Sequence, residues 1–308
     1  MIIGAIDVGS NSVKLLVAEV KSRESRVLAH RSAITRLGRG LGRTGLISRE
    51  AQERTLDALR EFRRLCDGLG AGRVVAVATE AVRIARNGRR FTERCRREAG
   101  IPLRVVSGRE EARLAFLGAT WGRRERRLAS IDVGGGSTEL MLGSPGRLET
   151  AASLPLGAVA LTEAHLASDP PSPREREALL EAVRRGLAEI PSRLRTGHAG
   201  TLLGIGGTCV NVARMAGLSE GKPLALAKLE SIFDRLAGVS LEERKTIQGL
   251  DPERADIIVA GAAILLGAMK FLGFGSIVTT VHGLRRGLVL EAANQKRGKG
   301  DKKSGKSR

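Results

Sequence analysis

Aromatic and cysteine side chains are scarce in this sequence of 308 residues. It contains six phenylalanines, one tryptophan and no tyrosine. Domains that bind single-stranded nucleic acid stack its bases on aromatic side chains, so this class of protein is disfavoured. The three cysteines, Cys66, Cys95 and Cys209, are far apart and lack CxxC spacing. We therefore expect neither a disulfide framework nor a cysteine-built zinc site, and we expect a reducing compartment.

Long apolar runs are also few. Residues 257–281 are apolar apart from Lys270, but the part before Lys270 is only thirteen residues long and includes two glycines. A membrane span needs about twenty apolar residues. We interpret this stretch instead as a buried helix, a turn and a buried strand. No basic segment followed by an apolar run begins the sequence, so we expect a cytoplasmic protein with no secretory signal and no membrane partner.

Positive charge, in contrast, is abundant. The net charge is +19, and residues 295–308 contribute seven lysines and arginines against one aspartate, so the rest of the chain is basic as well. A field of this sign favours polyanionic partners, such as phosphate polymers, highly phosphorylated nucleotides or nucleic acid. Composition predicts a disordered tail over residues 295–308. Through this tail we expect nucleic acid to bind only non-specifically.

One motif occurs twice and organises the chain. Residues 6–15 (IDVGSNSVKL) recur as residues 131–140 (IDVGGGSTEL), 125 positions later. Each copy has an apolar run, small polar residues and a second apolar run, which predicts a strand, a tight turn and a returning strand. A repeat this long indicates duplicated domains rather than a solenoid.

Helical and strand periodicities alternate between and after the two copies, which indicates α/β layers. The main expected elements are a helix that begins at Ser48 and ends at Gly70, a strand over 74–78, a helical segment over 81–85, a strand over 103–106, a helix over 107–117, a long helix over 173–194 and a strand over 202–205.

Three glycine-rich loops each follow a predicted strand, at residues 9–12, 134–138 and 204–208. Glycines let backbone N–H groups converge on phosphate oxygens, and neighbouring hydroxyls add donors. None of the loops matches the Walker pattern or the GxGxxG fingerprint. One such loop is usually a tight turn, but three in a duplicated frame, each ending in Ser or Thr, favour phosphate binding.

Carboxylates accompany these loops. Asp7 and Asp132 each end a buried strand beside a loop, where they could hold Mg²⁺ or cap their own turns. Glu139 on the second returning strand can face the same cleft, and its counterpart in the first copy is Lys14. This difference suggests that one side of the cleft is acidic and carries a metal ion, and that the other side is basic and holds phosphate.

The segment Ser107-Gly108-Arg109-Glu110-Glu111 separates two glutamates by their positions on a helix. Ser107 and Glu110 have capping-box spacing, so we expect Glu110 to close the helix start. Glu111 lies about 100° further around the helix and is free to activate water. The alternative is a solvated glutamate that favours the helix dipole.

Arg83 follows a predicted strand, and its guanidinium suits phosphate oxygens, although a solvated surface arginine is the alternative. The four histidines, His30, His165, His198 and His282, lack metal-ligand spacing, and we expect them to be structural or exposed. No Ser–His–Asp or Cys–His arrangement indicates covalent catalysis.

Together these motifs resemble the exopolyphosphatase / guanosine pentaphosphate phosphohydrolase (Ppx/GppA) family, a branch of the actin-like ATPase fold. The resemblance is carried by residues 6–12, 78–79 with Arg83, 106–112, 131–140, 204–208 and 283–285. It implies an α/β protein of two duplicated ribonuclease-H-like domains with a cleft between them. We place these domains at residues 1–123 and 124–294, with the last helix able to pack back on the first domain. We expect the short, two-domain form of the family.

The resemblance also implies roles for residues. Glu111 would be the base that activates water, Arg83 would hold phosphate, and Asp132 and Glu139, with Asp7 as a possible third ligand, would bind Mg²⁺ or another divalent cation. The loop residues that would cradle the substrate are Gly9, Ser10, Asn11, Ser12, Gly135, Gly136, Ser137, Thr138, Gly206, Gly207 and Thr208. The reaction would release terminal orthophosphate from a phosphoanhydride.

Two positions depart from the family pattern. Val281 and Arg286 stand where an aspartate and a glutamate are common, which removes acidic ligands from that loop and makes it more basic. The substrate would be inorganic polyphosphate or guanosine pentaphosphate, and the few aromatics and the positive charge favour polyphosphate.

A non-hydrolytic polyphosphate-binding module is the alternative from another class of protein. The presence of Glu111, Asp132 and Glu139 argues against it, because a pure binder of polyanions has no need for carboxylates. A sugar kinase of the same superfamily lacks support in the Glu-Glu-Ala element at residues 110–112. The sequence is also compatible with a homodimer.

Overall fold

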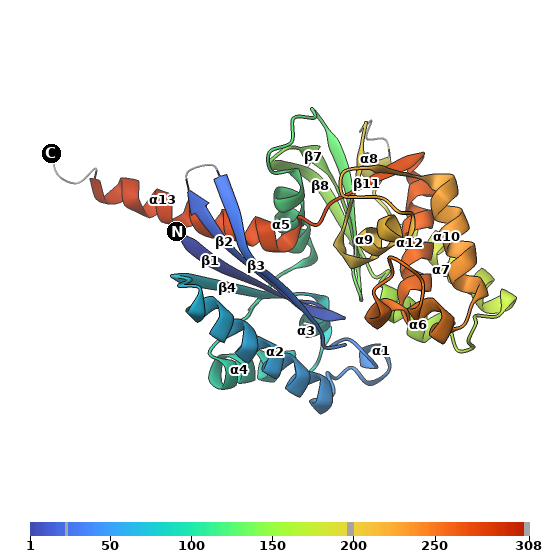
Figure 1. Cartoon of the computed structure of the whole chain (residues 1–308), viewed down its shortest axis with the longest axis horizontal. Helices are drawn as coiled ribbons and strands as arrows, with labels where there is room; N and C mark the ends of the chain where they lie inside the picture. Colours follow the sequence, from blue (N-terminus) through green and yellow to red (C-terminus); the bar gives the residue numbers. More distant parts are fainter. Residues whose placement is uncertain (22–23, 196–199, 305–308) are drawn as a thin grey trace.

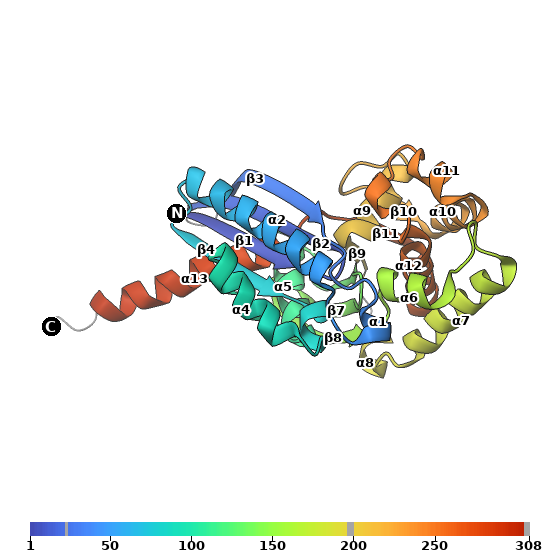
Figure 2. The ribbon, with the colours of Figure 1, turned by 90° about the horizontal axis from the view of Figure 1, so that it is seen from below.

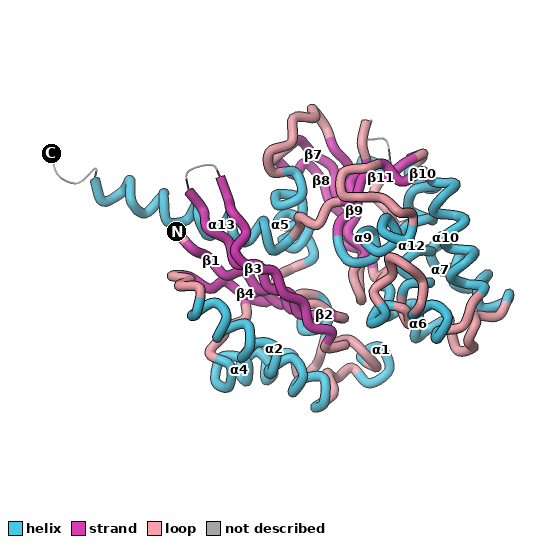
Figure 3. The backbone as a smooth tube through the Cα atoms, viewed as in Figure 1, coloured by secondary structure: helices cyan, strands magenta, loops and turns pink. Residues whose placement is uncertain are grey.

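The computed structural model of the chain describes residues 1–21, 24–195 and 200–304. Two β-sheets lie side by side, and helices cover their outer faces and fill the space between them (Figures 1 and 3). In the described ranges, no helix is both long and apolar enough to cross a membrane. The two-sheet α/β architecture expected from the duplicated motif is therefore present.

The first sheet has five strands in the order β3-β2-β1-β4-β5. Its strands are β1 (Ile2–Val8), β2 (Ser12–Lys21), β3 (Glu24–Ile34), β4 (Arg73–Ala78) and β5 (Arg104–Val105). The first three form an antiparallel meander, and β4 and β5 continue the sheet in parallel with β1. One face packs on α2 (Arg49–Gly68) and α4 (Gly88–Ala99) through an apolar core that includes Phe62 and Phe91.

The second sheet has six strands in the order β10-β11-β9-β6-β7-β8. Its strands are β6 (Leu128–Val133), β7 (Thr138–Ser144), β8 (Arg147–Leu154), β9 (Leu202–Ile205), β10 (Pro223–Ala225) and β11 (Ser276–Thr279). This sheet shares an apolar core with five helices, namely α6 (Ala158–His165), α7 (Pro173–Ala188), α9 (Gly206–Met215), α10 (Leu226–Gly238) and α12 (Ile258–Leu272). The short elements are α1 (Leu41–Thr44), α3 (Glu80–Ile84), α8 (Ser192–Arg195), α11 (Leu241–Lys245) and the 3-10 turn η1 (Pro252–Arg254).

Two helices fill the space between the sheets. They are α5 (Gly108–Thr120) and α13 (Leu284–Ser304), which pack against each other and share a core with residues of both sheets. Although α13 follows the last strand of the second sheet, it packs on β1, β2 and β4 of the first. Figure 2 shows α13 running along the first sheet and projecting beyond it.

The two copies of the motif form equivalent antiparallel hairpins, β1–β2 and β6–β7. Asp7 pairs in register with Lys14, and Asp132 pairs in register with Glu139. The turns also match, because the N–H of Gly9 donates to the Ser12 carbonyl at 3.1 Å and that of Gly134 donates to the Ser137 carbonyl at 2.9 Å. The duplication in sequence is therefore a duplication in backbone structure.

Three expectations about local structure need correction. The helix that begins at Pro173 ends at Ala188 and α8 follows separately, because Pro191 has no N–H to continue it. The capping box at α5 is only half formed: the Ser107 hydroxyl accepts from the Glu110 N–H, but the Glu110 carboxylate pairs with Arg104. Residues 295–304 were expected to be disordered, yet they continue α13, since they extend a helix whose first turns are buried.

Some of the expected features involve residues that the structure does not describe. Residues 305–308 of the tail and His198 are outside the described residues. The three cysteines are free and buried.

Candidate functional site

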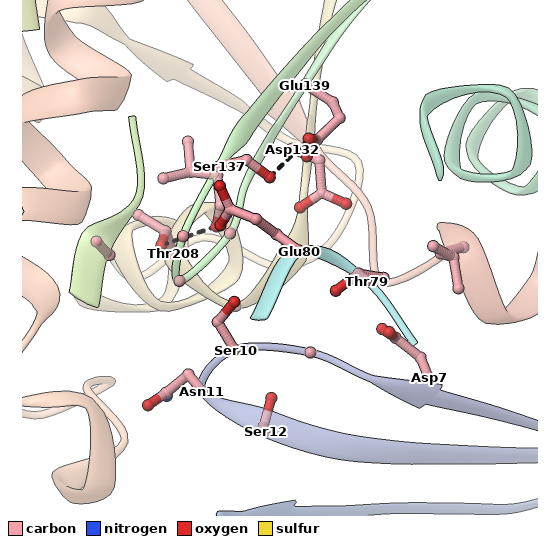
Figure 4. A pocket seen from close by; sticks show the side chains of 18 of the residues that line it. Asp7, Ser10, Asn11, Ser12, Thr79, Glu80, Asp132, Ser137, Glu139 and Thr208 are labelled. Carbon is pink, nitrogen blue, oxygen red and sulfur yellow. Dashed lines mark hydrogen bonds between the residues drawn. The ribbon is translucent and has the colours of Figure 1, made fainter. Parts of the chain in front are cut away.

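The three glycine-rich loops meet in one cavity between the sheets. They follow β1, β6 and β9, whose ends lie together because β6 and β9 are parallel neighbours and β1 occupies the equivalent place in the other sheet (Figure 4). The loop residues at the cavity wall are Gly9, Ser10, Asn11, Ser12, Gly134, Gly135, Gly136, Ser137, Gly207 and Thr208. The acidic residues at the wall are Asp7, Glu80, Glu111, Asp132 and Glu139.

Glycine is required where the loops approach one another and the carboxylates. A Cβ on Gly135 would lie 3.0 Å from the Ser10 Cβ and 3.2 Å from the Asn11 nitrogen. Gly206 has a φ of +86°, and a Cβ there would lie 2.4 Å from an Asp132 carboxylate oxygen. The loops can therefore close around a small, oxygen-rich group only with these glycines in place.

Three of the expected site residues do not line the cavity. Thr138 is buried, and its hydroxyl donates to the Leu156 carbonyl at 2.5 Å. Gly206 lies behind the Asp132 side chain. Arg83 donates from Nη1 to the Val106 carbonyl at 2.8 Å and lies 3.4 Å from the Glu111 carboxylate. The expected phosphate ligand Arg83 is thus a partner of the expected base.

Burial dominates the electrostatics of the carboxylates. Burial, together with the neighbouring charge of Asp132, raises the pKa of Glu139 to about 8, although hydrogen bonds from the hydroxyls of Ser137 and Ser153, both 2.8 Å, oppose the shift. Burial also raises the pKa of Asp132 to about 6, against the charge of Lys14. For Glu111, burial and the charge of Glu139 both raise the pKa. Nearby positive charge would let these carboxyls ionise.

These residues fit a divalent cation of the magnesium type. Among the described residues, no group of three acidic, histidine or cysteine side chains is placed to hold a metal ion. Mg²⁺ is, however, commonly held by one or two carboxylates together with substrate phosphates and water. Asp132 and Glu139 face each other across the β6–β7 hairpin and supply hard oxygen donors whose charges repel without a cation.

Sequence reasoning placed Lys14 on a phosphate-holding side but gave no site role to Arg254 or Arg285. Lys14 and Arg254 line the cavity, and the Arg254 guanidinium lies against Gly207, where a Cβ would be 2.3 Å from its central carbon. Arg285 donates to the Leu15 carbonyl at 3.1 Å and lies close enough to Asp7 and Asp132 to lower the pKa of each. Lys14 had a signal in the sequence, because the hairpin register places it opposite Asp7. Arg254 had none, since it arrives on a turn far along the chain.

Comparison with known proteins identifies the family. The model of the Ppx/GppA phosphatase family matches residues 16–296. The chain belongs to the Ppx/GppA phosphatase family. Its fold is accordingly the two-domain, actin-like fold that the sequence motifs implied, and its class is that of a phosphatase hydrolase.

Individual relatives of this Ppx/GppA phosphatase agree. Exopolyphosphatase 1 of Mycobacterium tuberculosis is 30% identical over 302 residues, which cover 94% of this chain and 88% of the relative. The crystal structure of the Aquifex aeolicus Ppx/GppA family member superimposes with a TM-score of 0.81 at 31% identity, covering 96% and 98% of the two chains. An exopolyphosphatase from Cytophaga hutchinsonii gives a TM-score of 0.89 at 25% identity, with the same coverage.

The loop that departs from the Ppx/GppA sequence pattern is held by a different acid. Glu220 accepts from the Thr280 hydroxyl and from the Val281 N–H, both at 2.9 Å. Val281 itself is exposed. A carboxylate from a distant part of the chain therefore binds this loop, although position 281 itself carries none.

Proposed function

We propose that this Ppx/GppA phosphatase is an exopolyphosphatase that removes terminal orthophosphate from inorganic polyphosphate. One observation carries the proposal. Glu111 lies at the wall of a cavity formed by three phosphate-type loops and by Lys14 and Arg254. A carboxylate placed among donors for phosphate oxygens suits the activation of water beside a bound phosphoryl group.

In the proposed reaction, Glu111 accepts a proton from the attacking water. The water oxygen forms a bond to the terminal phosphorus, the bond from that phosphorus to the bridging oxygen breaks, and the shortened chain leaves as an anion. Arg83 holds the Glu111 carboxylate, and the Val106 carbonyl fixes Arg83 in turn. Backbone N–H groups and hydroxyls of the loops bind the phosphate oxygens.

We assign the divalent cation to Asp132 and Glu139, with Asp7 as a further candidate. A bound Mg²⁺ supplies positive charge that offsets the charge of the phosphoryl oxygens. The hydroxyls of Ser137 and Ser153 orient Glu139 by donating to one of its oxygens, which leaves the other oxygen open. Lys14, Arg254 and Arg285 provide fixed positive charge around Asp132.

We propose polyphosphate rather than guanosine pentaphosphate as the substrate. The chain has few aromatic side chains on which a guanine could stack, and its net charge of +19 suits a long polyanion. The relative named Exopolyphosphatase 1 supports the same choice. Guanosine pentaphosphate remains the alternative, because it presents a terminal anhydride to the same loops.

The test is orthophosphate release, with Mg²⁺, from long-chain polyphosphate and from guanosine pentaphosphate under equal conditions. We expect faster release from polyphosphate, and a loss of at least about 100-fold in kcat in Glu111→Gln. Glu110→Gln is the matched control, because Glu110 is the adjacent residue and its carboxylate pairs with Arg104. Preference for the nucleotide would favour the alternative. Tight polyphosphate binding without hydrolysis would leave a binding module.

A further inference from the structure

A second cavity adjoins the first. It has a volume of about 480 Å³ and lies between α1 and α6, one from each half of the molecule. Apolar side chains such as Leu41, Ile84 and Val159 form much of its wall. Four residues border both cavities, namely Ser10, Glu80, Gly135 and Gly136.

The side chain of Glu80 lies between the loop that carries Ser10 and the loop that carries Gly136. Glu80 is the first residue of α3, one residue beyond the end of β4, and its side chain points toward the loop that carries Ser137 (Figure 4). A Cβ built on Gly136 would lie 1.5 Å from one Glu80 carboxylate oxygen and 3.1 Å from the Ser10 hydroxyl. The carboxylate therefore occupies the space that the absent Gly136 side chain leaves between the two loops.

The Glu80 carboxylate has few polar partners. Within the described residues, no hydrogen bond or salt bridge engages its side chain. Burial raises the pKa of this carboxyl, and the charge of Arg83 lowers it. Substituting Glu80 should therefore change the opening between the cavities without breaking a hydrogen bond, and Glu80→Gln separates the loss of charge near Arg83 from the loss of volume.

Positive charges of the catalytic cavity gather around Asp132. Lys14, Arg254 and Arg285 all lie close enough to Asp132 to lower its pKa. Glu80 lies close enough to Glu139 to raise the pKa of that carboxyl. A polyanion is attracted to the group of three cations and not to the Glu80 carboxylate.

We propose that Glu80 is the steric barrier that restricts this enzyme to cleavage at the end of a polyphosphate chain. The body of the polyphosphate chain lies along Lys14, Arg254 and Arg285, and its terminal phosphate meets the Glu80 side chain, which blocks the way into the second cavity. This inference rests on the proposed function and adds a residue that determines its mode of cleavage.

The volume of the Glu80 side chain is what blocks the passage. With a small residue at position 80, a chain can run past Gly136 into the second cavity, so that an internal anhydride lies beside Glu111. Water then attacks an internal phosphorus. The bond to one bridging oxygen breaks, and two shorter chains result in place of one orthophosphate.

The experiment compares wild type, Glu80→Ala and Glu80→Gln on two forms of long-chain polyphosphate. One form has free ends, and in the other both terminal phosphates are blocked as phosphoramidates. The products are separated by anion-exchange chromatography. We expect wild type and Glu80→Gln to release orthophosphate from free-ended chains and to leave blocked chains intact. In Glu80→Ala we expect short oligophosphates, and discrimination against blocked chains reduced by about ten-fold or more.

Arg43→Ala is the control, because Arg43 is exposed and borders the second cavity but not the catalytic cavity. It should keep the wild-type products. Glu80→Ser is a second small variant if Glu80→Ala fails to fold, as checked by its melting temperature. The proposal is overturned if the small variants still yield orthophosphate alone, or if Glu80→Gln cuts blocked chains as fast as Glu80→Ala. A wild type inactive on free-ended chains would overturn the proposed function as well.

Discussion

The guanidinium of Arg83 lies 3.4 Å from the carboxylate of Glu111 and is fixed by a second bond to the Val106 carbonyl. This pair joins the segment after β4 to the first turn of α5. It connects a positive charge to the one carboxylate that we assign to proton transfer. Its contribution to the acidity of Glu111 can be measured.

We expect Arg83→Gln to shift the acidic limb of the pH profile of kcat/KM toward higher pH. Burial and the charges of Glu139 and Asp7 raise the pKa of Glu111, and Arg83 opposes them. A protonated Glu111 cannot accept a proton, so activity falls below its pKa. Without the opposing cation the pKa rises, and we expect the limb to move by roughly one to three pH units.

The control for this shift is Arg89→Gln, which removes an exposed arginine paired with Glu93 at 3.3 Å. Its profile should match wild type. If Arg83 served only as a phosphate ligand, its substitution would raise KM at every pH and leave the limb in place.

Magnesium should stabilise the protein more at high pH than at low pH. Burial raises the folded-state pKa of Asp132 to about 6 and that of Glu139 to about 8. Their contribution to stability is full below the unfolded pKa near 4 and is lost as pH rises through these values, because buried carboxyls must then ionise. A bound cation offsets that cost. We expect the gain in melting temperature on adding Mg²⁺ to be larger at pH 8.5 than at pH 5.5.

Thermal unfolding with and without Mg²⁺ at the two pH values tests this expectation. Asp132→Asn should abolish most of the gain, because it removes one proposed ligand. An equal gain in Asp132→Asn and wild type would place the cation elsewhere.

Gly206→Ala should inactivate the enzyme, and Gly217→Ala should not. Both glycines have positive φ, +86° and +74°, so each alanine costs about 1 kcal/mol of stability. A Cβ at Gly206 would also lie 2.4 Å from the Asp132 carboxylate, whereas one at Gly217 has no neighbour within 4 Å. Displacing Asp132 should reduce kcat/KM by about 100-fold.

The measurement combines melting temperature with kcat/KM for both variants. Loss of activity in Gly206→Ala alone, at a temperature at which both variants remain folded, would agree with the expectation. Equal activity in the two variants would show that Asp132 tolerates displacement.

The sequence predicted the hairpins because their signal is local. The apolar alternation and the small polar turn of residues 6–15 determine strand, turn and register, and the second copy repeats them. The strand that ends at Ala78 and the helix that begins after Ser48 were also correct, since Ser48 caps the helix by accepting from the Ala51 N–H. These elements depend on neighbours within a few residues.

The remaining parts of the site depend on contacts between distant segments. Arg254 reaches Gly207 from a short turn before α12, and nothing in its own neighbourhood marks it. Glu80 resembles any acidic residue in the first turn of a helix, and it acquires a position between two cavities only because Gly136 approaches it. Glu110 had the spacing of a capping box, but Arg104 provided a stronger partner. Long-range packing decided each of these cases.

The placement of α13 on the first sheet has a consequence for biosynthesis. Buried residues of this helix, including Leu288 and Val289, share a core with Ile3 and Ala5 at the start of the chain. During translation the first sheet emerges from the ribosome early, but one of its faces cannot be covered until nearly the whole chain has been made. The two halves must therefore mature together, and a nascent chain halted before residue 284 would present an uncovered apolar face to chaperones.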